Sequence, residues 1–189
     1  MPYSINTLAK VLGEIKEAGI DFVVIGDTVV YLETKNRDLE GDVDLLVTNM
    51  SPFVEEENIR SIAEEHGWGF GYTDLGTPRL IVRTSEGDVI VELYENIHDF
   101  YIPEEMVQEA KKIRIRNVEV NIIHVEDYII LKARAGGPED LEKLSKILDF
   151  IKSKGYRLNQ RILRRHISFF EPDEQQLIRS RLEGLGVKL

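Results

Sequence analysis

The spacing of apolar and polar positions along the chain predicts both helices and strands. Over residues 5–18, apolar side chains recur at the three- and four-residue intervals of an amphipathic helix, which Gly19 would end. Short apolar or alternating runs predict strands over 22–25, 42–47, 68–72, 79–84, 89–94, 111–116 and 118–123. Further helices are predicted over 28–34, 54–66, 104–110, 125–135 and 138–151, with two short ones between 158 and 182.

These elements together predict the class of fold. Strand runs that follow one another through a tight turn, as around 85–88, indicate an antiparallel section within a mixed sheet. The predicted class is therefore α/β (α+β), a mixed β-sheet flanked by helices with a helical C-terminal region. We expect residues 1–124 to form the α/β core and 125–189 to pack on it as a helical region, the two making one compact unit.

The strand predicted over 42–47 carries two acidic side chains on one face. Because strand side chains alternate, Asp42 and Asp44 point the same way and lie about 6–7 Å apart along the strand. Hard divalent cations such as Mg²⁺ are usually held by one or two carboxylates together with water and substrate phosphates. Glu92, inside the apolar strand 89–94, is a third candidate ligand, the alternative being an edge-strand acid that faces solvent or a lysine.

An apolar strand that ends at Gly26, a short helix and then Asp42-x-Asp44 on a strand form a pattern. The pattern resembles the nucleotidyltransferase superfamily of the DNA polymerase β type, most closely its minimal, antitoxin-like branch. The resemblance implies a nucleotidyltransferase-like fold, with Mg²⁺ or Mn²⁺ held by Asp42, Asp44 and Glu92. It also implies that an NTP donates a nucleoside monophosphate to a hydroxyl, with Gly26 and Asp27 beside its phosphates. Asp27 departs from the Gly or Ser of the family, and Glu92 is one methylene longer than the Asp of the family.

A second signature of the resembled family falls on the helices predicted over 125–135 and 138–151. The matching positions are Asp127, Lys132, Ala135, Asp140 and Leu141. The resemblance implies that Lys132 reaches the nucleotide phosphates, whereas the alternative is a salt bridge from Lys132 to Asp140 or Asp127. Lys143 stands where the family has a further acid.

Charge and composition limit the classes of partner and the cellular location expected for the protein. The formal net charge of −10 disfavours a nucleic acid partner without excluding it, because Lys and Arg supply most of the affinity for phosphate backbones. The basic run Arg161, Arg164, Arg165 and His166 is expected to face solvent or a partner. No apolar run approaches the roughly 20 residues that cross a bilayer, and no secretory signal is visible. Together with the absence of cysteine, these features favour a cytoplasmic protein without membrane association.

Two classes of function fit these observations. The first is a metal-dependent nucleotidyltransferase that acts on a protein, a small molecule or an RNA end. The second is a catalytically impaired binding module of the same fold, favoured by the carboxylate of Asp27 beside the expected phosphates. A third interpretation is an unrelated α/β domain with surface acids. The antitoxin-like resemblance implies a protein partner such as a helical, toxin-like ribonuclease, and it leaves the acceptor, the nucleobase and the oligomeric state open.

Overall fold

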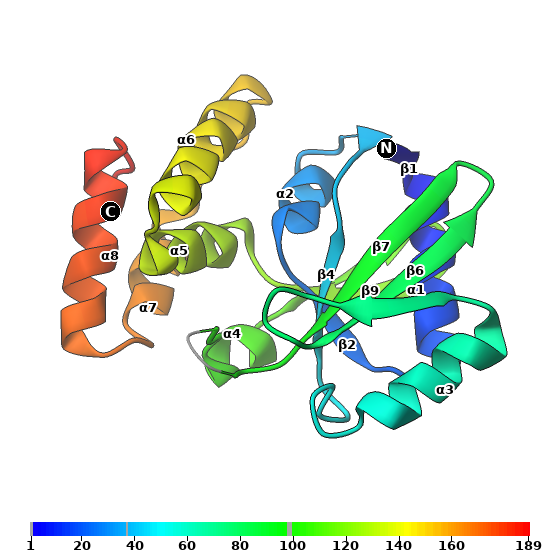
Figure 1. The fold of residues 1–189 in the computed structure, drawn as a ribbon. Helices are drawn as coiled ribbons and strands as arrows, with labels where there is room; N and C mark the ends of the chain where they lie inside the picture. The colour runs from blue at the N-terminus through cyan, green and yellow to red at the C-terminus, as the bar shows by residue number, and fades with distance from the viewer. Residues whose placement is uncertain (1, 37, 98–99) are drawn as a thin grey trace.

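A mixed sheet forms the first part of the molecule (Figure 1). The computed structural model describes residues 2–36, 38–97 and 100–189. Over these residues the seven strands run in the order β5-β6-β7-β4-β2-β9-β8. Strand β2 is parallel to β9 and β4 is parallel to β7, whereas the other neighbours are antiparallel. The strands are β2 (Phe22–Val24), β4 (Val43–Val47), β5 (Gly69–Tyr72), β6 (Pro78–Thr84), β7 (Gly87–Tyr94), β8 (Lys111–Ile115) and β9 (Val118–Ile122).

The predicted strands are therefore confirmed, with small differences at their ends. The strand expected from residue 42 begins at Val43, so Asp42 lies just before β4. The structure adds a two-stranded antiparallel pair, β1 (Tyr3–Ser4) with β3 (Asp38–Leu39), which was not predicted. Such two-residue strands are too short to show a periodicity of two in the sequence.

The helices fall into two groups along the chain. Those before residue 124 flank the sheet: α1 (Ile5–Glu17), α2 (Asp27–Glu33), α3 (Glu56–His66) and α4 (Glu104–Gln108). The side chain of Ser4 caps α1 by accepting a hydrogen bond from the Thr7 amide. The second group stands to one side of the sheet in Figure 1 and comprises α5 (Val125–Ala135), α6 (Pro138–Ser153), α7 (Gln160–Ile167) and α8 (Pro172–Gly184).

Helix α5 joins the two parts of the molecule. It packs against α2 on one side and against α6, α7 and α8 on the others. Ile129, Ile130 and Ala133 are fully buried, because neighbours surround the helix. At its end Arg181 of α8 donates to the carbonyl oxygens of Ala133 and Arg134 at 2.7 and 2.8 Å, which supplies hydrogen bonds that a helix end otherwise lacks. Among the described residues, no helix has the length and apolar character needed to cross a membrane.

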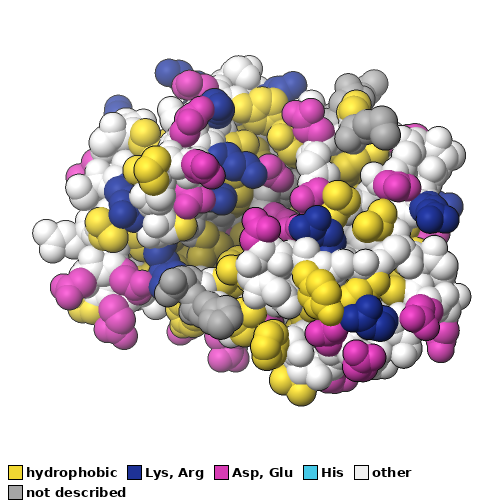
Figure 2. Space-filling view, in the orientation of Figure 1, with side chains coloured by type: hydrophobic (Ala, Val, Ile, Leu, Met, Phe, Trp, Pro, Cys, Tyr) yellow, Lys and Arg dark blue, Asp and Glu magenta, His cyan; other side chains and the backbone are white. Residues whose placement is uncertain are grey.

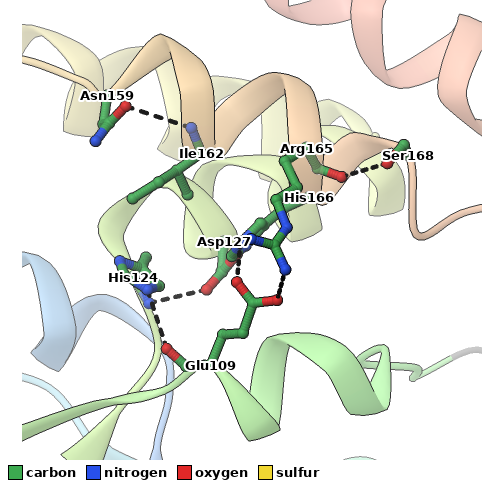
Figure 3. A network of polar contacts seen from close by, with 8 residues as sticks. All are labelled: Glu109, His124, Asp127, Asn159, Ile162, Arg165, His166 and Ser168. Atoms are coloured by element: carbon green, nitrogen blue, oxygen red, sulfur yellow. Dashed lines mark hydrogen bonds and ion pairs between the residues drawn. The ribbon is translucent and has the colours of Figure 1, made fainter.

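The basic run in α7 faces solvent except at one position. Arg161, Arg164 and Arg165 are exposed, but the prediction was wrong for His166, which is buried with 1% of its surface exposed. Figure 3 shows His166 between the carboxylates of Asp127 and Glu109. Its Nδ1 contacts Asp127 of α5, and its Nε2 is 3.2 Å from Glu109. The run appears uniformly basic in sequence, yet helical periodicity turns His166 toward α5.

Candidate functional site

Acidic side chains from four places in the chain gather where the sheet faces α5. Asp27 begins α2, Asp42 precedes β4, Asp44 lies on β4 and Glu92 lies on β7. The parallel register pairs Asp44 with Glu92 directly across the two strands. Figure 2 shows this face of the molecule hollowed between the sheet and the helices, with acidic and apolar side chains around the hollow.

Gly26 makes room for the carboxylate of Asp44. Its φ of 70° lies in the region that favours glycine. A Cβ atom placed on Gly26 would lie 2.0 Å from Oδ2 of Asp44, far inside van der Waals contact. The amide of Ile25 donates to the carbonyl oxygen of Asp44 at 2.9 Å, so the strand end that carries Gly26 is fixed against β4. The strand-glycine unit and the acidic strand are thus one local structure.

The pKa of Asp44 shows how strongly the acids crowd one another. Burial raises it first, and the charges of Asp27 and Glu92 raise it further, to about 7, although Lys143 opposes the shift. The ionised form of Asp44 is therefore disfavoured in the free protein. A cation bound among these carboxylates would favour the ionised form.

Glu92 is already engaged by two neighbours. Nε of Arg79, on β6, lies 3.2 Å from one carboxylate oxygen, and the hydroxyl of Tyr94 donates to the other. Strand β7 lies between β6 and β4, so the alternative of an edge-strand acid does not apply. The structure places Glu92 beside Asp44, and its role as a ligand remains a prediction.

Asp27 and Lys132, which are also predicted to lie beside the phosphates, each form an ion pair within the protein. Asp27 forms an ion pair with Lys143 of α6, Oδ2 to Nζ being 3.0 Å. Nζ of Lys132, on α5, lies 2.8 Å from Oδ1 of Asp140. This is one of the two salt bridges that were predicted as the alternative to phosphate binding. Asp127 is not available to Lys132, because it bonds to His166 and to the amide of His124.

A hard divalent cation fits the donor set of this cluster in its chemistry. Asp42, Asp44 and Glu92 supply carboxylate oxygens, the ligands that Mg²⁺ and Mn²⁺ prefer. As the side chains stand, no three Asp, Glu or His residues of the described chain form a ready-made metal site. Glu92 would therefore have to loosen its contacts with Arg79 and Tyr94 to share a cation with the two aspartates.

A cleft of about 260 Å³ opens above Gly26 and Asp44 and is walled by α5. Its remaining lining is largely aromatic and aliphatic: Ile25, Leu75, Tyr94, Phe100, Tyr101, Ile102, Tyr128, Leu131, Lys132, Arg134 and Ala135. Tyr128 is buried, and its hydroxyl has no hydrogen-bond partner among the described residues. Burial, followed by the charge of Asp27, raises the pKa of Tyr128, which keeps the hydroxyl protonated as a donor.

Sequence reasoning missed several residues of this site. Two of them carry a signal within one element, since Tyr94 follows Glu92 by two positions on a strand and Tyr128 precedes Lys132 by four on a helix. Each pair must therefore share a face. Arg79 faces Glu92 across the hairpin of β6 and β7, so its signal is the register of that predicted turn. Lys143 carries no local signal, because Asp27 lies far away in the chain.

Comparison with known proteins gives a family and a fold. A family model described as "Nucleotidyl transferase of unknown function (DUF2204)" matches residues 4–184. A structure of an antigenic nucleotidyltransferase-like protein from Paracoccidioides brasiliensis has 18% identity and a TM-score of 0.57, covering 98% of this chain and 89% of that chain. At this identity the likeness shows the fold alone, and it confirms the predicted nucleotidyltransferase-like class.

More distant structural similarities are to an antibiotic-resistance factor. ANT(2'')-Ia in complex with adenylyl-2''-tobramycin has 14% identity and a TM-score of 0.46, over 94% of this chain and 97% of that chain. The solution structure of ANT(2'')-Ia has 13% identity and a TM-score of 0.44, over 95% and 91%. No curated protein matches the sequence.

Proposed function

The chain belongs to the nucleotidyl transferase family whose model matches residues 4–184, and from this premise we propose that it transfers a nucleoside monophosphate from an NTP to a hydroxyl acceptor. Membership of the family supports nucleotidyl transfer in general. The NTP donor, the need for Mg²⁺ or Mn²⁺ and the residues involved are our proposals. The observation that carries them is the position of Asp44, which lies against Gly26, lines the cleft and is paired with Glu92 across β4 and β7.

Asp42, Asp44 and Glu92 would hold the divalent cation. When bound, such a cation stabilises the charge of the triphosphate and makes an acceptor hydroxyl easier to deprotonate. Because Asp44 has a raised pKa, it must release its proton as it becomes a ligand, so cation affinity should rise with pH. Gly26 keeps the floor of the cleft open, since any side chain there would collide with Asp44.

The cleft supplies binding and orientation. Its aromatic and aliphatic walls suit a flat ring and exclude water from the acidic floor. The hydroxyl of Tyr128 is a buried donor that has no partner within the described part of the chain, and a phosphate or ribose oxygen would satisfy it. Lys132 lies on the same wall, where the resemblance puts a phosphate-binding lysine, although Asp140 neutralises it in the free protein.

A second candidate function is a nucleotide-binding or partner-binding module without transfer. It is favoured by Glu92, whose two carboxylate oxygens are engaged by Arg79 and Tyr94. The antitoxin-like branch, a ribonuclease-like protein partner and the cytoplasmic location remain predictions from the sequence.

Calorimetric titration of Mg²⁺-NTPs into wild type and the Asp42→Asn/Asp44→Asn variant tests the proposed site. We expect wild type to bind and the variant to lose about 100-fold or more in affinity, since loss of even an outer partner of a metal ligand costs about 10- to 100-fold. Asp88→Asn, which removes an exposed acid of β7, is the matched control and should bind as wild type does.

The outcomes separate the two candidate functions. Binding together with release of pyrophosphate from the NTP supports transfer, whereas binding without any release favours the module. If wild type binds no NTP with either Mg²⁺ or Mn²⁺, both nucleotide functions are wrong. If the double variant binds as tightly as wild type, the nucleotide lies elsewhere.

A further inference from the structure

Two residues that depart from the resembled family pattern are in contact in the structure. Asp27 stands where that pattern has Gly or Ser, and Lys143 stands where it has an acid. The structure brings these two side chains, from α2 and α6, within 3.0 Å of each other as an ion pair. The acid and the base at these two positions therefore neutralise each other in this chain.

The charges of the cluster explain why such a pair matters. Arg79 lies against Glu92 and Lys143 lies against Asp27. Among the described residues, neither Asp42 nor Asp44 forms an ion pair, whereas Glu92 would have to loosen its contact with Arg79 to join them as a ligand of a divalent cation. Without Lys143, the uncompensated carboxylate of Asp27 would repel a polyphosphate that approached the same cation.

Lys143 is placed to do more than neutralise Asp27. The Asp27 side chain is only 15% exposed, whereas that of Lys143 is 51% exposed, so the ammonium group is within reach of a ligand. An ammonium group has three donors and a flexible stem, and the contact with Asp27 uses one donor. The charge of Lys143 also opposes the rise in the pKa of Asp44 that burial and the neighbouring acids cause.

We propose that Lys143 binds the polyphosphate of the nucleotide, and that in the free protein it neutralises Asp27 at the acidic cluster. This inference rests on the proposed function, because it assigns the phosphates of the same nucleotide to a named cation. It differs from the role that the resemblance gives to Lys132, whose ammonium group is 2.8 Å from Asp140 on the neighbouring helix.

The test is a set of titrations with Mg²⁺-ATP, and with Mg²⁺-tripolyphosphate as a probe that lacks the nucleoside. The proteins are wild type, Lys143→Met, Asp27→Ser and the Asp27→Ser/Lys143→Met double variant. Lys143→Met should weaken both probes by about tenfold or more, the effect expected of one charge-assisted hydrogen bond. Asp27→Ser should bind as tightly as wild type or more tightly, and the double variant should bind better than Lys143→Met.

Two further variants make the result specific. Lys143→Arg keeps the charge and should retain most of the affinity, which guards against a fault in folding. Lys146→Met, three positions along α6 and exposed, is the control that removes an equivalent charge outside the cluster.

Each outcome decides the question. If Lys143→Met binds both probes as wild type does, or if Lys146→Met loses as much affinity, the inference is overturned while the proposed function stands. If Asp27→Ser weakens binding as strongly as Lys143→Met, then Asp27 is itself a ligand and the inference is also wrong. If wild type binds neither probe, the proposed function fails and the inference fails with it.

Discussion

Gly26 shows how a single missing Cβ atom shapes the candidate site. The residue has φ of 70° and ψ of −166°, a conformation that is nearly restricted to glycine. Because the carboxylate of Asp44 occupies the place of the absent side chain, glycine is needed there for two reasons, backbone strain and space. The two reasons can be separated by experiment.

We predict that Gly26→Ala abolishes Mg²⁺-NTP binding as well as lowering stability. Gly19, with φ of 83° and nothing within 4 Å of an added Cβ atom, provides the matched control. Each substitution should lower the free energy of unfolding by about 1–3 kcal/mol through backbone strain. Only Gly26→Ala should displace Asp44 and lose binding, as measured by urea unfolding and calorimetry. Equal binding by both variants would show that the position of Asp44 is not critical.

At the scale of elements, the contacts of His166 tie three segments together. They join α7 to Asp127 of α5 and to Glu109, which follows α4 and leads into β8. Burial would lower the pKa of His166, but hydrogen bonds and charges from Asp127 and Glu109 outweigh it and raise the pKa above 6.5. The imidazolium form is therefore stabilised in the folded protein.

The direction of the pH dependence follows from that raised pKa. The folded state holds the proton of His166 more tightly than the unfolded state, so its contribution is fully present below the unfolded pKa of 6.5. The contribution is lost as the pH rises through the folded pKa, with a slope of up to about 1.4 kcal/mol per pH unit.

We predict that His166→Gln removes this part of the pH dependence. Urea unfolding of wild type at increasing pH from 6.5, the ordinary pKa of histidine, should show a steeper decline than the variant, which keeps only the decline due to other groups such as Asp44. His66→Gln, which changes an exposed histidine stacked on Trp68, should keep the decline of wild type. Parallel curves for wild type and His166→Gln would mean that another group causes the slope.

At the scale of the whole molecule, the cleft depends on both parts of the chain. Its floor comes from Gly26 and Asp44 of the sheet region, whereas Tyr128 and Lys132 in its wall belong to α5. Because α5 also packs on α2, separation of the helical part would expose its apolar side chains to water. The predicted division at residues 1–124 and 125–189 is thus compatible with a single folding unit.

We predict one cooperative unfolding transition. Scanning calorimetry should give a ratio of van't Hoff to calorimetric enthalpy of about one, as for small domains that unfold in one step. Saturating Mg²⁺-NTP should shift the whole transition to higher temperature, because ligand binding stabilises the folded state. Two resolved transitions, with only the first or the second moved by ligand, would contradict this prediction.

Much of the fold was accessible from the sequence for a local reason. Strand alternation, helix spacing and the glycines near element ends depend on residues only a few positions apart. These signals located β4, β7 and α5 to within about a residue or two, and they placed Asp42 and Asp44 at the start of one strand. The two-residue pair of β1 and β3 escaped because it is shorter than the period by which strands are detected.

What the sequence by itself determined is most of the elements, the two carboxylates at the start of one apolar strand and a third inside another. Its predicted turn around 85–88 also brings the strands of Arg79 and Glu92 together. Only the tertiary structure decided that Lys143 meets Asp27 and that His166 meets Asp127, partners that lie 116 and 39 positions apart, as their residue numbers show. These contacts depend on helix packing, which the whole core determines together and which no local pattern encodes.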